Sequence, residues 1–209
     1  MDILDEIQED VKKEKLLSFF QNYGKYLVAV ILACFIFTIL YFWWSNYKSN
    51  LLLEDSSEYN DAINSKEQVR ISKLEKIKQK NSVYGDLAKL QLAAYYYDDK
   101  DYNKSIHNYE LIYKSKSSSE IYRDYAKLMA IKIRVHTGKI SLDDGIKLYE
   151  DFYKDSKYFK NIAVLGESIL LLNKGNYSSN LHKINEILTD NEAPNLLLYL
   201  AKTINKRLS

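Results

Sequence analysis

Residues that interrupt or punctuate a chain are scarce in this sequence. One proline and six glycines occur among 209 residues, so it offers few of the tight turns that β-rich folds require. The single cysteine, Cys34, cannot form a disulfide within the chain. The formal net charge is only +2, with no block of one sign, which argues against a nucleic-acid partner. These absences predict a mostly helical chain that binds no nucleic acid.

The longest apolar run covers residues 26–44, which contain no charge, glycine or proline. As a helix this run is about 28 Å long, close to the hydrocarbon thickness of a bilayer. A buried helix of a soluble core is the alternative, but such helices seldom stay apolar around their whole circumference. The run therefore predicts a transmembrane helix over residues 26–44, with Cys34 near its middle. Its expected membrane-interface aromatics are Tyr23, Tyr26, Tyr41, Trp43 and Trp44.

Lysines are distributed unequally around this run. Lys12, Lys13, Lys15 and Lys25 precede it, whereas Lys48 is the only basic residue in the next stretch, 45–64. By the positive-inside rule, residues 1–25 are expected in the cytoplasm and residues 45–209 outside it. The run is too long for the apolar part of a cleaved signal peptide, so we expect a single-pass anchor that is retained.

Residues 2–22 carry apolar side chains at helical spacing, beginning with Ile3, Leu4, Ile7 and Val11. They predict a short helix that rests on the membrane surface, leads into the span, or docks on a membrane partner. Gly24 is expected to interrupt the helical pattern before the span.

A repeat is visible from residue 84 onward. Three segments, 101–112, 141–152 and 176–187, share a large residue near the start, a small residue three positions later and a bulky residue four positions after that. Small residues allow close helix approach, and the bulky ones fill the space between helical pairs. The nine positions are Tyr102, Leu142 and Tyr177; Ser105, Gly145 and Asn180; Tyr109, Tyr149 and Ile184.

Each of these segments follows another helical pattern, at residues 84–97, 120–136 and 160–173. Gly138 and Gly175 lie in the turns of the second and third pairs and suit helix ends with positive φ. The last segment, 194–208, starts with proline and ends with basic residues, so it is expected to cap the stack. The spacing predicts an all-α domain of helical hairpins over residues 45–209.

The hairpin pattern resembles the tetratricopeptide repeat, whose second helix often opens Gly-Asp/Asn-Tyr. Gly175-Asn176-Tyr177 matches this opening, Lys100-Asp101-Tyr102 matches except at glycine, and Leu142 replaces the tyrosine of the second pair. This resemblance implies a tetratricopeptide-like solenoid whose first helices line a concave peptide-binding surface. By repeat geometry, Tyr97, Lys127 and Arg134 would face that groove. The alternative has Tyr97 in the core and the two basic side chains solvated.

The whole arrangement resembles a narrower family, the ancillary SecYEG translocon subunit of Gram-negative bacteria. The resemblance rests on Asp5-Glu6 before Lys12-Lys13, Tyr23-Gly24 before the span, Trp43-Trp44 after it, and Tyr-Gly-Asp-Leu-Ala at residues 84–88. It implies an inner-membrane protein beside the Sec channel, whose periplasmic domain binds emerging polypeptides or periplasmic chaperones.

No catalytic, metal or cofactor motif is recognisable. His107, His136 and His182 fall in different hairpins and lack metal-type partners at helical spacing. The sequence therefore predicts a scaffold and not an enzyme. Three alternatives remain open: a scaffold for another envelope machine such as cell division or outer-membrane assembly, an enzyme whose site is assembled from scattered residues, and a domain that lies in the cytoplasm.

Overall fold

A computed structural model describes the backbone of residues 3–208 and the side chains of residues 18, 23–26 and 28–206. The described part of the chain is helical and contains no strand, as the scarcity of turn residues predicts. The helices are α1 (Ile3–Ile63), α2 (Glu67–Ile77), α3 (Val83–Asp98), α4 (Tyr102–Tyr113), α5 (Glu120–His136), α6 (Leu142–Asp155), α7 (Lys160–Asn173), α8 (Tyr177–Thr189) and α9 (Asn195–Leu208).

The chain divides into two units, residues 1–54 and residues 55–209. In the first unit the apolar run lies on α1, and its large side chains are exposed, Phe37 by 77% and Trp43 by 67%. Among the described residues, one helix is long and apolar enough to cross a membrane, with a mean hydropathy of 2.4 over its best window and none of that window buried. The run from residue 26 to residue 44 is thus a candidate span.

The predicted interruption at Gly24 is wrong. Helix α1 passes through Gly24 without a break, because glycine inside a helix costs only about 1 kcal/mol and long helical patterns continue on both sides of it. The apolar stripe of Ile3, Leu4, Ile7 and Val11 lies on side chains outside the described residues.

The second unit begins within α1, whose last turns pack against α2 and α3. Ala62 is buried together with Leu74, Ile77 and Leu92. The Nζ of Lys80 lies 2.7 Å from Asp55 and 2.8 Å from Glu58. These contacts attach the end of the long helix to the repeat domain through both apolar burial and charge.

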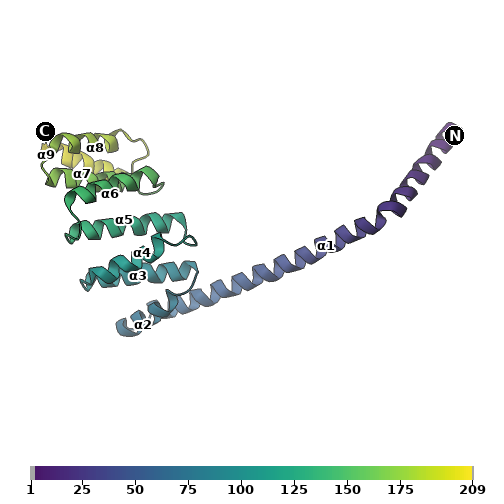
Figure 1. Ribbon diagram of the computed structural model, residues 1–209, viewed down its shortest axis with the longest axis horizontal. Helices are drawn as coiled ribbons and strands as arrows, with labels where there is room; N and C mark the ends of the chain where they lie inside the picture. Colours follow the sequence, from purple (N-terminus) through teal and green to yellow (C-terminus); the bar gives the residue numbers. More distant parts are fainter. Residues whose placement is uncertain (1–2, 209) are drawn as a thin grey trace. The chain divides into compact units, whose positions relative to one another are not determined.

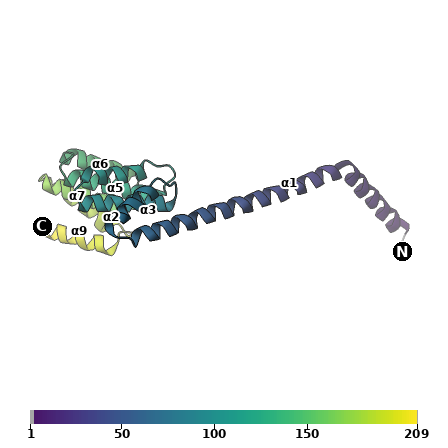
Figure 2. The same cartoon turned by 90° about the horizontal axis from the view of Figure 1, so that it is seen from below.

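Three helical pairs follow, α3 with α4, α5 with α6, and α7 with α8. Figures 1 and 2 show the helices of this unit stacked in chain order, with α9 beside α7 and α8. The predicted helical-hairpin architecture is confirmed, and the predicted helices over residues 120–136 and 160–173 have the bounds of α5 and α7.

The turns inside the pairs reuse one local design. Gly138 and Gly175 have φ values of 65° and 77°, as the sequence predicts, and Lys100 takes the equivalent place with φ of 64°. In the first and third pairs, the residue directly after the positive-φ position caps the second helix. The side chain of Asp101 accepts a hydrogen bond from Lys104 N, and that of Asn176 accepts one from Ser179 N. Local chain chemistry therefore sets where each second helix begins.

The predicted small residues lie where the two helices of a pair are in close contact. Ser105 and Asn180 are fully buried, and each donates to a carbonyl of the preceding helix, to Ala93 O at 2.7 Å and to Ser168 O at 2.6 Å. A Cβ on Gly145 would lie 2.8 Å from a methyl carbon of Val135. A larger side chain at these positions would push the two helices of a pair apart.

The apolar core is divided into four clusters in chain order, not gathered into one. They centre on Leu92, Ile112, Phe152 and Ile184. This division is typical of solenoids, in which each repeat buries its apolar faces only against its neighbours.

We predict that Lys100→Gly stabilises the domain by about 0.5–1 kcal/mol. A residue with a Cβ is strained at positive φ, whereas glycine is not. Thermal unfolding of the full chain in detergent, followed by circular dichroism, measures the change.

Lys147→Gly is the matched control, because Lys147 is exposed in the middle of α6. There the same replacement should destabilise by about 1 kcal/mol. Loss of stability in both variants would contradict the strain at Lys100.

Candidate functional site

A hollow of about 780 Å³ forms a groove in the repeat domain, with walls mainly from α5 and α7 and contributions from α3 and α6. We call it the apolar section. Its floor contains the buried side chains of Leu128, Leu165 and Leu170, and Ile162 and Ile169, each 43% exposed, lie one above the other on α7. Exposed isoleucines lining a concave surface are an energetic cost unless a partner covers them.

Aromatic rings extend this surface. Tyr125 is 37% exposed, and its ring centroid lies 6.3 Å from that of Tyr109 and 5.9 Å from that of Phe159. These rings form a continuous row between α4, α5 and the start of α7. Tyrosines and phenylalanines with this spacing provide large contact area at low loss of conformational entropy.

Two further hollows continue from the apolar section, one after the other. The middle section, about 420 Å³, shares Tyr125 and Phe159 with it and has no charged residue in its lining. The acidic section, about 490 Å³, lies between α2 and α3 and shares Gln91 and Ala94 with the middle section. Through the middle section the three sections form one series, from α2 and α3 to α5 and α7.

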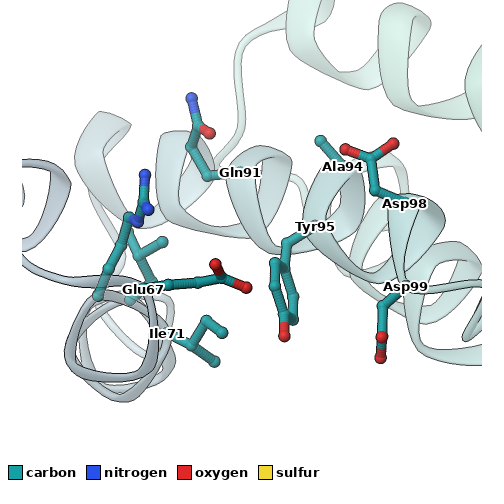
Figure 3. A pocket seen from close by; sticks show the side chains of 9 residues that line it. Glu67, Ile71, Gln91, Ala94, Tyr95, Asp98 and Asp99 are labelled. Carbon is teal, nitrogen blue, oxygen red and sulfur yellow. The ribbon is translucent and has the colours of Figure 1, made fainter.

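The acidic section differs from the others in charge. Glu67, Asp98 and Asp99 line it together with one guanidinium, that of Arg70. Figure 3 shows the carboxylate of Glu67 directed toward the ring of Tyr95. In the apolar section the only ionisable lining groups besides tyrosines are Lys132 and His136.

Of the three residues expected to face a groove, Tyr97 lines the apolar section and also packs against the core. Lys127 has its Nζ 5.7 Å from the ring centroid of Phe152, and Arg134 is bound to the carboxylate of Glu110. Neither basic residue is among the lining of the three sections. The face of a helix that a residue occupies depends on how that helix rotates against its neighbours, which a degenerate repeat alignment does not define.

Comparison with protein families matches residues 17–163 to the tetratricopeptide repeat-like domain. The chain belongs to this family. The match ends at the beginning of α7, and the structure adds a third pair, α7 and α8, whose turn has the same positive φ and the same N-terminal cap as the first. Comparison with curated proteins and with solved structures gives no significant match.

Tetratricopeptide-like repeats typically act as protein-interaction scaffolds, and the ionisation of the groove tyrosines agrees with such a use. Burial raises the pKa of Tyr149 to about 12, and burial with the neighbouring Tyr125 raises the pKa of Tyr109 further. Both phenols are therefore neutral at physiological pH and serve as apolar surface.

One cluster of perturbed groups lies outside the groove and was not apparent in the sequence. Glu167, only 4% exposed, lies 3.3 Å from the Nζ of Lys183, which also donates to the hydroxyl of Tyr153 at 2.5 Å. Burial raises the pKa of Glu167, against the opposing effect of Lys183. None of the three lines a section of the groove. The arrangement joins α6, α7 and α8, so we assign it to stability.

The described residues include no group of three or more histidine, cysteine, aspartate or glutamate side chains arranged to hold a metal ion. The three histidines of the chain lie on different helices, α4, α5 and α8, and the ring of His136 has its centroid 6.5 Å from that of Tyr97. The groove is lined by apolar, aromatic and charged side chains.

We predict that Lys183→Met destabilises the domain by about 3 kcal/mol, because it leaves the carboxylate of Glu167 buried without a compensating charge. Without the lysine, the pKa of Glu167 rises further above its value of 4.5 in the unfolded chain. Unfolding by urea at several pH values tests this: stability of the variant should increase as the pH falls from 7 toward 4.5, because the folded state then binds the extra proton.

The double variant Lys183→Met/Glu167→Leu should regain most of the loss. Lys154→Met removes a lysine from an exposed pair with Glu150 and should change the unfolding midpoint little. Equal effects of Lys183→Met and Lys154→Met would argue against a buried charge.

Proposed function

We propose that this protein is a membrane-anchored scaffold that binds segments of other polypeptides in the groove of its repeat domain. The observation that supports this most directly is the apolar section, where Ile162, Ile169 and Tyr125 are exposed on a concave surface. Groove recognition by helical solenoids uses surfaces of this kind.

The anchor is the second part of the proposal. Exposed large apolar side chains along α1 are favourable in lipid and unfavourable in water, and a helix satisfies its own backbone groups in the bilayer. Holding the groove at a membrane raises its effective concentration beside a membrane complex, so weak contacts with a client can suffice.

We further propose that residues 1–25 lie in the cytoplasm and that the repeat domain lies in the periplasm of a bacterial inner membrane. The lysines before the span support this orientation. The resemblance to the ancillary SecYEG subunit supports a place beside the Sec translocon, where the groove would meet emerging polypeptides or periplasmic chaperones. A scaffold of another envelope machine would have the same groove and anchor but different partners.

The groove is tested with Ile162→Gln/Ile169→Gln. Removing two exposed apolar side chains from the wall should weaken binding of a neutral twelve-residue peptide of leucine, phenylalanine and serine about tenfold. Fluorescence anisotropy of the labelled peptide with the full chain in phosphatidylcholine nanodiscs measures the affinity, with empty nanodiscs as the lipid control.

Val69→Gln/Leu111→Gln is the matched variant, because both residues are exposed and apolar but line none of the three sections. It should bind as the native chain does. Equal loss in both variants, or no binding by the native chain, would refute a peptide groove at this place.

The partner is tested by co-purification of the tagged chain from membranes in mild detergent. We expect Sec channel subunits with the native anchor, and a reduced yield when residues 1–44 are replaced by an unrelated anchor. As a control for orientation, protease digestion of intact spheroplasts should cleave the repeat domain equally in the protein with the native anchor and in the protein with the unrelated anchor. Recovery of division or assembly factors without Sec subunits would overturn the Sec assignment and leave the groove intact.

A further inference from the structure

Charge is distributed unequally along the groove. The lining of the acidic section has three carboxylates and one guanidinium, a formal charge of −2. The middle section has no charge, and the apolar section has Lys132 and His136 but no carboxylate. The groove therefore has an electrostatic direction, negative between α2 and α3 and neutral to positive between α5 and α7.

The carboxylates of the acidic section form none of the close ion pairs found among the described residues. Among the described residues, Glu67, Asp98 and Asp99 make no ion pair within 4.0 Å. Acidic residues nearby on α1 are paired, for example Asp61 with Lys73 at 2.6 Å. The three carboxylates of the acidic section thus lack a close ion pair, and Arg70 in the lining and the more distant Lys104 offset their negative charge only in part.

An aromatic ring stands among these carboxylates. Tyr95 is half-buried and lines the acidic section, with the carboxylate of Glu67 directed toward it (Figure 3). The neighbouring Tyr96 already has the Nζ of Lys104 5.0 Å from its ring centroid, whereas no lysine or arginine of the described chain lies over Tyr95. A ring beside carboxylates suits an ammonium or guanidinium group, through cation–π and charge attraction together.

We propose that the groove takes a polypeptide segment that is basic at one end and apolar over the rest. Its lysine or arginine side chains lie in the acidic section, and its apolar side chains cover Ile162, Ile169 and Tyr125. This inference rests on the proposed peptide-binding function and adds the class and direction of the ligand. With neighbouring helices about 10 Å apart the sections span about 30 Å, which an extended chain covers in about nine residues.

Three labelled twelve-residue peptides test the ligand class. They share the apolar part described above and differ at one end, which contains three lysines, three glutamines or three glutamates. With the full chain in phosphatidylcholine nanodiscs at 0.1 M salt, the lysine peptide should bind about fivefold more tightly than the glutamine peptide, and the glutamate peptide more weakly than either. The preference should shrink at 0.5 M salt.

The variant Asp98→Asn/Asp99→Asn should remove most of the fivefold preference and leave the affinity for the glutamine peptide within about twofold. Asp151→Asn/Asp155→Asn removes two exposed carboxylates of α6 that line no section of the groove; it should keep the preference. Loss of the preference in both pairs of variants would assign it to net charge and overturn the acidic section as the cause.

The outcomes separate this inference from the proposed function. Equal binding of the three peptides, or tighter binding of the glutamate peptide, would overturn the charge preference while the groove stands. Failure of all three peptides to bind would overturn both.

Discussion

Each helical pair of this protein buries its apolar faces only against the pairs beside it, and most of the structure follows from that constraint. The core is divided into clusters along the stack, and the ends need covering, by the last turns of α1 and by α9. The second helices fill the space between pairs, and residues of the first helices α3, α5 and α7 line the hollows of the described domain. The groove forms along these helices, and a solenoid obtains it without a separate domain.

The contact within a pair depends on one position near the start of each second helix. At this position the two helices of a pair lie close together. Ser105 and Asn180 fit there because each donates a hydrogen bond to a carbonyl of the preceding helix, and Gly145 fits because it has no side chain. A buried polar side chain is tolerated there because its donor is satisfied. The three repeats therefore place different residue types at this position, and each type allows the two helices to pack closely.

Charges in the repeat domain have two different roles. Lys80 and Lys183 neutralise carboxylates that are buried or partly buried, and so join elements that are distant in sequence. The carboxylates of Glu67, Asp98 and Asp99 instead line the groove and make no ion pair within 4.0 Å among the described residues. Removing one partner of the first kind would leave a buried carboxylate without a compensating charge, whereas we propose that the second kind binds a ligand.

The sequence by itself determined the all-α class, the apolar run, the bounds of α5 and α7, the positive φ of Gly138 and Gly175, and the packing positions Ser105, Gly145 and Asn180. These features follow from local periodicity, caps and residue size.

The tertiary structure alone decided which face each helix presents. It therefore put Tyr97 in the wall of the groove, turned Lys127 and Arg134 to Phe152 and Glu110, and brought Glu167, Lys183 and Tyr153 together from three helices. Gly24 was predicted from its local sequence to interrupt the helix, but α1 continues through it because helical patterns extend on both sides. Contacts across many residues depend on the rotation and stacking of whole helices, and no short pattern in a degenerate repeat specifies those.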